Sequence, residues 1–252
     1  MSRQDTIKDL ADRLRRMERR AAPAAGREPS IGTGHAALDS VLPAGGLRRG
    51  TLLEWINGEG PGSGAATLAL LAAGGLIRQQ ESGPAGTLAV VDRDGGFYAA
   101  AAAGLGLSPE RILLVQAGSE DEWKWAVEQV LRSSAVDVVL TWADSLDDRV
   151  FRRWQLAAEL GGGVGMLVRS AEVVREASWA SVRLMVRGCV GEESATGRRW
   201  SVRVLSGGVG RGAWRAGYQE RDVLLELNDE TGGLRLLPRL ERAVPPGVSA
   251  TG

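Results

Sequence analysis

A strand, a glycine-rich turn and a helix follow one another in the stretch Glu54-Trp55-Ile56-Asn57-Gly58-Glu59-Gly60-Pro61-Gly62-Ser63-Gly64-Ala65-Ala66-Thr67-Leu68. An apolar run enters the turn, and a helix-forming run that starts at Ala65 leaves it. The N–H groups of such a turn and the positive end of the helix dipole can cradle a phosphate group. The pattern predicts the frame of a phosphate-binding loop, which consists of Gly58, Gly60, Gly62, Ser63, Gly64, Ala65, Ala66 and Thr67.

The loop lacks the side chains that act on a nucleotide. The complete motif, G-x-x-x-x-G-K-[ST], places a lysine on the outer phosphates and a hydroxyl group on magnesium. Here Gly64 is followed by Ala65 and Ala66. A methyl group cannot neutralise the charge that develops on a transferred phosphoryl group. We therefore expect no ATP hydrolysis at this loop.

Nucleotide binding without hydrolysis is a separate question. Backbone amides between Gly60 and Gly64 could still hold an anion, which leaves ATP as the candidate ligand. The simpler interpretation is a tight strand-to-helix turn, in which the glycines serve only to permit positive φ. We favour this interpretation, so the sequence predicts no bound cofactor.

The composition is that of an ordinary globular protein. The 252 residues are 44% hydrophobic and 25% charged, and Lys+Arg and Asp+Glu both number 31, so net charge does not indicate a nucleic-acid partner. The single Cys189 excludes an intrachain disulfide, and the single His35 gives little basis for a metal site. No apolar run reaches ~18 residues, and the first residues are charged, so we expect a cytoplasmic protein without a membrane contact.

Strands and helices alternate between residues 51 and 169. Short apolar runs at residues 51–56, 86–92, 111–116, 136–142 and 164–169 are typical of buried parallel strands. Helical patterns separate them at residues 65–78, 97–105, 123–131 and 150–160. This alternation predicts an α/β fold, with right-handed crossovers and a mostly parallel sheet between helices.

The pattern changes after Ser178. Strand-like runs at residues 181–187, 199–205, 223–227 and 234–237 have no long helices between them. The turn at residues 228–233, Asn-Asp-Glu-Thr-Gly-Gly, joins the last two runs as a hairpin. We expect an antiparallel extension on one edge of the sheet.

Both ends of the chain are predicted to lie outside the main domain, which spans residues 30–240. Residues 1–22 have the spacing of an amphipathic helix, with an apolar stripe of Ile7, Leu10, Leu14 and Met17. That stripe suits a partner protein, and packing on its own domain is an equally good interpretation. Residues 23–29 are a plausible linker, and residues 241–252 a frayed tail.

Basic and aromatic residues are interleaved near the end of the chain. Such residues could track a nucleic-acid backbone and stack on bases; the candidates are Arg198, Arg199, Arg203, Arg211 and Arg215, with Trp200, Trp214 and Tyr218. The alternative is a solvated strand face whose aromatic residues lie in the core. We favour the alternative, which leaves only weak DNA contact.

The order of these pieces resembles the RecA-type ATPase core over residues 30–237. Residues 31–50, which begin Ile-Gly-Thr-Gly, look like the segment before the phosphate loop of RecA. Residues 135–139 look like its Walker B strand, and residues 180–184 like the strand after its second DNA-binding loop. That loop would fall between residues 169 and 179, where the chain is short and acidic.

Four short segments carry a narrower resemblance, at residues 152–159, 178–180, 198–200 and 226–232. They resemble the ImuA family of RecA-like accessory proteins in bacterial damage-induced mutagenesis. The resemblance implies three partners: RecA, an ImuB-like inactive homologue of Y-family polymerases, and an error-prone DNA polymerase. The shared core leaves open a recombinase-like ATPase that depends on DNA, and a SulA-like inhibitor of cell division.

Carried over residue by residue, the RecA pattern has lost its reactive groups. Ala65 matches the phosphate lysine, Ala66 the magnesium hydroxyl and Trp142 the Walker B aspartate. Asp94 matches the water-activating glutamate, and together with Asp144 it is a residual catalytic candidate. Ser170 matches the glutamine that senses the phosphate in RecA. Ser206 and Gly208 match two lysines of RecA that reach a neighbour's nucleotide. The resemblance therefore implies a non-catalytic adaptor in SOS-induced translesion synthesis.

Overall fold

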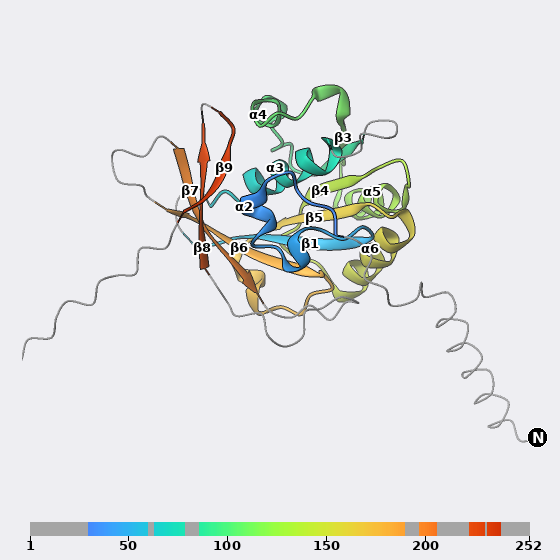
Figure 1. Cartoon of the computed structure of the whole chain (residues 1–252). Helices are drawn as coiled ribbons and strands as arrows, with labels where there is room; N and C mark the ends of the chain where they lie inside the picture. The colour runs from blue at the N-terminus through green and yellow to red at the C-terminus, as the bar shows by residue number, and fades with distance from the viewer. Residues whose placement is uncertain are drawn as a thin grey trace, which may run out of the picture.

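The computed structural model describes residues 30–59, 63–78, 86–189, 197–205, 222–229 and 231–237. Within these ranges the strands form one sheet in the order β3-β2-β4-β5-β1-β6-β7-β8-β9 (Figure 1). The strands are β1 (Thr51–Asn57), β2 (Leu88–Asp92), β3 (Ile112–Gln116), β4 (Val138–Trp142), β5 (Val164–Arg169), β6 (Val182–Cys189), β7 (Gly197–Leu205), β8 (Asp222–Asn228) and β9 (Leu234–Leu237).

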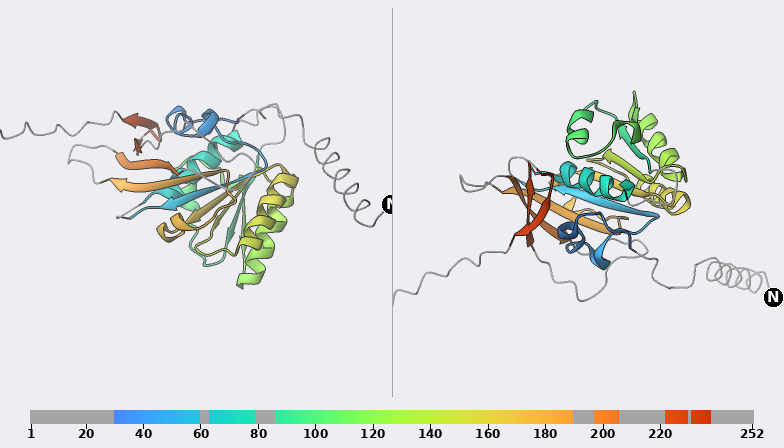
Figure 2. Two further views of the ribbon diagram at one scale, coloured as in Figure 1. Left: turned by 90° about the horizontal axis from the view of Figure 1, so that it is seen from below. Right: turned by 45° about the horizontal axis from the view of Figure 1, so that its top comes forward.

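Helices cover both faces of the parallel part of the sheet. Helix α3 packs on one face, and α5 and α6 lie side by side on the other (Figure 2). The α-helices are α2 (Ala36–Asp39), α3 (Ala65–Arg78), α4 (Ala99–Gly104), α5 (Glu120–Arg132) and α6 (Asp148–Gly161), and the 3₁₀ helices are η1 (Pro43–Gly45), η2 (Pro109–Arg111) and η3 (Ala171–Arg175). Two hydrophobic cores result, one on each side of the sheet.

The predicted α/β class is confirmed. Strands β3, β2, β4, β5, β1 and β6 are parallel to their neighbours, and β7, β8 and β9 continue the sheet antiparallel from β6. In β1 the side chains from Thr51 to Ile56 are all buried, because neighbours flank the strand on both edges and both of its faces are covered. This central strand leads directly into the loop that the sequence singled out.

Strand β3 departs from the prediction. Its apolar run indicated a buried strand, but β3 pairs only with β2 and forms an edge of the sheet, where Leu113 and Leu114 are exposed. An apolar run of this length predicts a strand without revealing its place in the sheet, which depends on the path of the whole chain.

Several predictions fall outside the described residues. These concern the stripe of Ile7, Leu10, Leu14 and Met17, the linker, the tail, and residues Gly60, Gly62, Ser206, Gly208, Arg211 and Arg215. The domain boundaries stay predictions for the same reason. Across the described ranges, the structure has no helix with the length and apolar character needed to cross a bilayer.

Candidate functional site at the head of helix α3

The loop after β1 leads to the N-terminus of α3 as the sequence predicts. Gly64 has a φ of 75°, in the left-handed region that favours glycine, and its carbonyl accepts the N–H of Leu68 at 2.9 Å. Before the turn, the N–H of Gly58 donates to the carbonyl of Val186 at 2.7 Å and ties the end of β1 to β6. The described ends of the loop therefore follow the predicted order of strand, turn and helix.

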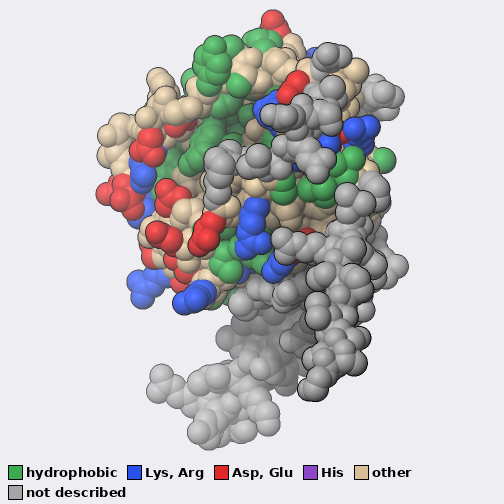
Figure 3. Space-filling model, turned by 90° about the vertical axis from the view of Figure 1, so that its left-hand side faces the viewer, with side chains coloured by type: hydrophobic (Ala, Val, Ile, Leu, Met, Phe, Trp, Pro, Cys, Tyr) green, Lys and Arg blue, Asp and Glu red, His purple; other side chains and the backbone are tan. Residues whose placement is uncertain are grey.

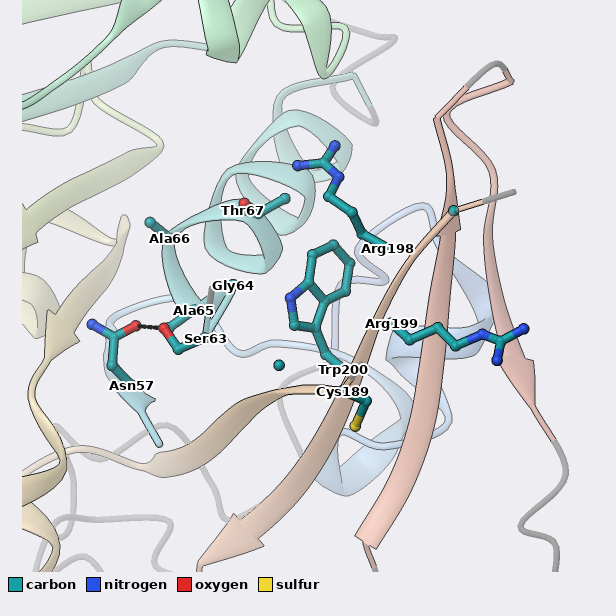
Figure 4. Close-up of a pocket in the computed structure, with 12 residues that line it drawn as sticks. Asn57, Ser63, Gly64, Ala65, Ala66, Thr67, Cys189, Arg198, Arg199 and Trp200 are labelled. Carbon is teal, nitrogen blue, oxygen red and sulfur yellow. Dashed lines mark hydrogen bonds between the residues drawn. The ribbon is translucent and has the colours of Figure 1, made fainter. Parts of the chain in front are cut away.

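A pocket of about 580 Å³ lies beside this helix end. The loop and α3 form one wall, with Ser63, Gly64, Ala65, Ala66 and Thr67. Strands β6 and β7 form the other (Figure 4). Of the predicted loop residues, Gly58 does not line it, and Asn57 and Cys189 are additions that the sequence gave no reason to choose.

The indole of Trp200 stands against the loop. Trp200 is almost fully buried, and a Cβ built on Gly64 would lie only 1.9 Å from its Nε1 atom. Figure 4 shows its ring directed at the head of α3. The hydroxyl group of Ser63 is engaged as well, because it donates to Oδ1 of Asn57. The sequence suggested that Trp200 belongs either to a DNA track or to the core; the structure places it in the core, against the loop.

The two residual catalytic candidates lie elsewhere. Asp94 is exposed, and its carboxylate pairs with the guanidinium of its neighbour Arg93 at 3.0 Å. Asp144 is also exposed, and its Oδ1 accepts the N–H of Ser170 at 3.2 Å. Neither residue lines the pocket. Both carboxylates have local roles: Asp94 forms an ion pair with Arg93, and Asp144 accepts a backbone hydrogen bond at the end of β5.

Trp142 ends strand β4 where the resemblance expects a magnesium-binding aspartate. Its indole packs against the core under α3 and against the ring of Phe97, with 6.4 Å between ring centroids. The buried carboxylate nearby belongs to Asp92, whose Oδ1 accepts the N–H of Gly95 at 3.0 Å and whose Oδ2 accepts that of Phe97 at 2.7 Å. That carboxylate shapes a turn. Within the described ranges, no group of three His, Cys, Asp or Glu side chains could hold a metal ion.

The described arginines of the proposed DNA track are paired with carboxylates. Arg198 donates to Asp229 at 2.8 Å and Arg203 donates twice to Asp222 at 2.6 Å. Arg199 points away from the pocket (Figure 4) and donates to Glu226 at 2.7 Å. Its hydrogen bond is the chief reason that the pKa of Glu226 is lowered, and Arg235 contributes a second one.

These pairs join β7 to the neighbouring strand β8. On the face seen in Figure 3, Lys and Arg side chains are scattered among acidic ones, and hydrophobic side chains gather in a hollow. Cross-strand ion pairs stabilise a sheet locally, and paired guanidinium groups have less charge to offer a phosphate backbone.

A buried ion cluster lies under the opposite face of β1. The carboxylate of Glu54 is fully buried and accepts from the guanidinium groups of Arg169 and Arg183. Arg169 also donates to the carbonyl of Ala143 at 2.7 Å, and Arg183 to that of Val173 at 2.7 Å. A charged residue inside an apolar strand run was the signal in the sequence that could have identified it.

The cluster fixes the segment that joins β5 to β6. The resemblance puts a DNA-binding loop of RecA here, but η3 folds back onto the sheet and Val173 is completely buried. Arg183 donates to carbonyls of this segment, at Val173, Val174 and Glu176. In the structure the segment is a packed crossover.

Comparisons with known proteins agree with this architecture. The RecA N-terminal domain model matches residues 24–166. A RecA protein from Desulforapulum autotrophicum is 34% identical over 137 residues, which are 54% of this chain and 35% of the relative. An ImuA protein from Caulobacter vibrioides is 31% identical over 144 residues, which are 56% of this chain and 57% of the relative.

The matches therefore span about a third of the RecA relative and under three fifths of the ImuA relative. They confirm the resemblance to RecA and ImuA that the sequence indicated. Because the matching model covers more than half of the residues and the strand pattern agrees with it, the chain belongs to the RecA N-terminal domain family.

Proposed function

We propose that this chain is a non-catalytic, RecA-like accessory protein of SOS-induced translesion DNA synthesis. It acts as an adaptor between RecA, an ImuB-like inactive homologue of Y-family polymerases and an error-prone DNA polymerase. The observation that supports this proposal is an intact RecA-like frame whose loop presents Ala65 and Ala66 at the head of α3. The similarity to ImuA supplies the biological setting.

The chemistry of the loop argues for an adaptor. Phosphoryl transfer depends on positioned cations, and methyl groups occupy the two positions that would supply a lysine and a magnesium ligand. Trp142 cannot replace a carboxylate on magnesium, and its indole is packed against Phe97. The fold then serves to bind partner proteins through its surfaces and not to catalyse a reaction.

We also propose that no nucleotide is needed. Trp200 packs on Gly64 beside the amides that would hold a phosphate, and the guanidinium of Arg198, which lines the pocket, is paired with Asp229. Weak DNA contact would use the same arginines of β7 and would have to compete with their carboxylate partners.

A phosphate-release assay tests the absence of catalysis. The purified full chain is incubated with ATP and magnesium, with and without single-stranded DNA, and no release above a protein-free control is expected. Ala65→Lys/Ala66→Thr serves as a control for how much of the site those two side chains restore. Turnover that disappears in Asp94→Ala would overturn the proposal and establish an ATPase.

A binding assay tests the adaptor role. The full chain and a chain without residues 1–22 are compared for capture of purified RecA and of a purified ImuB-like protein. We expect the full chain to bind at least one of them, and we expect the stripe of Ile7, Leu10, Leu14 and Met17 to strengthen that binding. An absence of binding to both proteins would count against the adaptor.

A further inference from the structure

The outer sides of α5 and α6 carry large apolar side chains that face solvent. Trp125 on α5 is 63% exposed, and Leu156 and Leu160 on α6 are 42% and 72% exposed. We call these three residues the outer apolar face. The other sides of both helices pack on the sheet, where Trp123 and Trp154 meet edge to face.

Contacts between the two helices fix their register. Nε1 of Trp154 donates to the carbonyl of Lys124 at 3.1 Å, and a Cβ built on Gly161 would lie 2.1 Å from the carbonyl oxygen of Leu131. Seven residues separate 124 from 131, and seven separate 154 from 161. The two helices therefore run in the same direction, and Figure 2 shows them side by side.

This register brings the outer apolar face to similar heights on the two helices, which are also linked on this side by the ion pairs that Glu128 makes with Arg132 and Arg153. Trp125 follows Lys124 by one residue and Leu156 follows Trp154 by two, so they differ by about 1.5 Å along the helix axes. Leu160 lies four residues beyond Leu156 and therefore one turn further along the same side of α6. An aromatic residue on one helix and two leucines on the other thus offer apolar contacts to a third helix, beside the ion pair that links α5 to α6; we call this surface the seat.

The N-terminal part of the chain enters the domain beside this seat. Ile31 forms two backbone hydrogen bonds with Leu47, at 2.7 and 2.8 Å. Three residues after Leu47, Gly50 touches the last turn of α6, where a Cβ would lie 3.3 Å from Cα of Glu159. The seven residues 23–29 can span about 23 Å when extended, which is enough to cross one helix layer.

We propose that residues 3–20 dock as a helix on the outer apolar face of their own chain. Ile7, Leu10, Leu14 and Met17 cover about 15 Å at helical rise, which matches a seat on two neighbouring helices. A short amphipathic helix gains most of its stability from packing of its apolar side, and the seat offers that packing at the point of entry. This docking requires no partner protein.

Disulfide trapping tests the docking in the full chain. In a Cys189→Ser background, Leu14→Cys is combined with Leu156→Cys and exposed to a mild oxidant at low protein concentration. We expect an intrachain disulfide to form about tenfold faster than in two controls, because docking raises the effective concentration of the two thiols.

The controls separate docking from chance collision. Leu14→Cys with Leu236→Cys uses a leucine of similar exposure, 48%, on edge strand β9. Arg16→Cys with Leu156→Cys uses the polar side of the N-terminal segment. Equal rates in all three proteins would overturn the proposal, and an interchain disulfide would instead place the segment on a second copy of the chain.

A charge on the seat gives a second readout that needs no engineered cysteine. Leu156→Asp with Leu160→Asp should increase tryptic cleavage within residues 1–29 several-fold, while Leu113→Asp on edge strand β3 should leave it unchanged. Thermal melting checks that each variant folds. Unchanged cleavage in the folded Leu156→Asp/Leu160→Asp protein would contradict docking.

Docking also predicts a change in partner binding, and this prediction rests on the proposed function. A docked stripe is hidden from RecA and from an ImuB-like protein, so Leu156→Asp/Leu160→Asp should bind them more tightly than the parent chain. If the intrachain disulfide forms as expected but the affinity for both partners does not change, the docking is supported and the stripe has no role in partner binding.

Discussion

The two faces of strand β1 differ in the side chains that they bury, which are apolar on one face and ionic on the other. On the face toward α3, Leu53 and Trp55 belong to the core, and the strand leads into a loop whose reactive positions are alanines. On the opposite face, Glu54 is held by two buried guanidinium groups. Successive side chains of one strand thus lie in the hydrophobic core under α3 and in an ionic network on the opposite face.

The difference shows which charges this fold requires for itself. A lysine or magnesium ligand at the head of α3 would act on a nucleotide, and with Ala65 and Ala66 at this place β1 still leads through the loop into α3. Glu54, by contrast, links three strands and the η3 crossover through Arg169 and Arg183. The network under β1 serves the architecture, and this contrast can be tested by substitutions on both faces.

The largest expected effect comes from Glu54→Gln. Removing Glu54 leaves the buried guanidinium of Arg183 without a carboxylate partner and that of Arg169 with only the half-exposed Glu176, and we expect the unfolding free energy to fall by about 3–5 kcal/mol. Urea denaturation measures the loss. Glu226→Gln is the matched control, because Glu226 is buried but its partner Arg235 is mostly exposed, and it should cost about 1 kcal/mol. Equal losses of stability in both variants would show that the ionic network under β1 stabilises the fold no more than the ion pairs of Glu226 do.

On the other face, Gly64→Ala should destabilise the chain by about 2–4 kcal/mol. The new Cβ would meet the indole of Trp200, and alanine is strained at a φ of 75°. In a Trp200→Ala background the added cost should shrink to about 1 kcal/mol, since only the backbone strain remains. Additive effects in this double-mutant cycle would mean that Trp200 does not press on the loop.

A smaller effect is expected from pH on the α3 side of the sheet. Burial lowers the pKa of His35 below its ordinary value of 6.5, and the guanidinium of Arg78 at the end of α3 adds to the shift. The unfolded chain then takes up the proton more readily, so this contribution to stability is complete above pH 6.5 and declines as the pH falls below that value. Melting temperatures of the parent and of His35→Gln between pH 5 and 8 measure the slope, which should be shallower in the variant.

The smallest effect is expected from Asp94→Asn. Its ion pair with Arg93 is exposed, so stability should change by less than about 0.5 kcal/mol. Asp92→Asn, two residues earlier, should cost about 1–3 kcal/mol because that buried carboxylate accepts backbone N–H groups. If the two variants behave alike in thermal melts, Asp94 has a structural partner beyond Arg93.

Local patterns in the sequence predicted the elements well. The apolar run at residues 164–169 coincides with β5, and the helical run from Ala65 ends at Arg78 as expected. Apolar spacing reports how a segment itself is folded, which is why these elements and the RecA-like order could be inferred.

Pairings between distant segments could not be inferred. Glu54 is a charged residue in an apolar run, but its partners Arg169 and Arg183 lie 115 and 129 residues away. The sequence left open a basic track at the arginines of β7, because their carboxylate partners lie on or next to β8, such as Glu226 for Arg199. Strand order and cross-strand neighbours depend on the path of the whole chain, on which local periodicity carries no information.

The buried cluster also has a consequence for the order of events during synthesis. A carboxylate enters the centre of a sheet at great cost while it has no counter-ion, and both counter-ions of Glu54 are made more than a hundred residues after it. Among the described strands, β1 also pairs only with β5 and β6, which carry these two arginines. We therefore expect β1 to take its place in the sheet only after β5 and β6 have left the ribosome, later than β2, β3 and β4, which pair with one another.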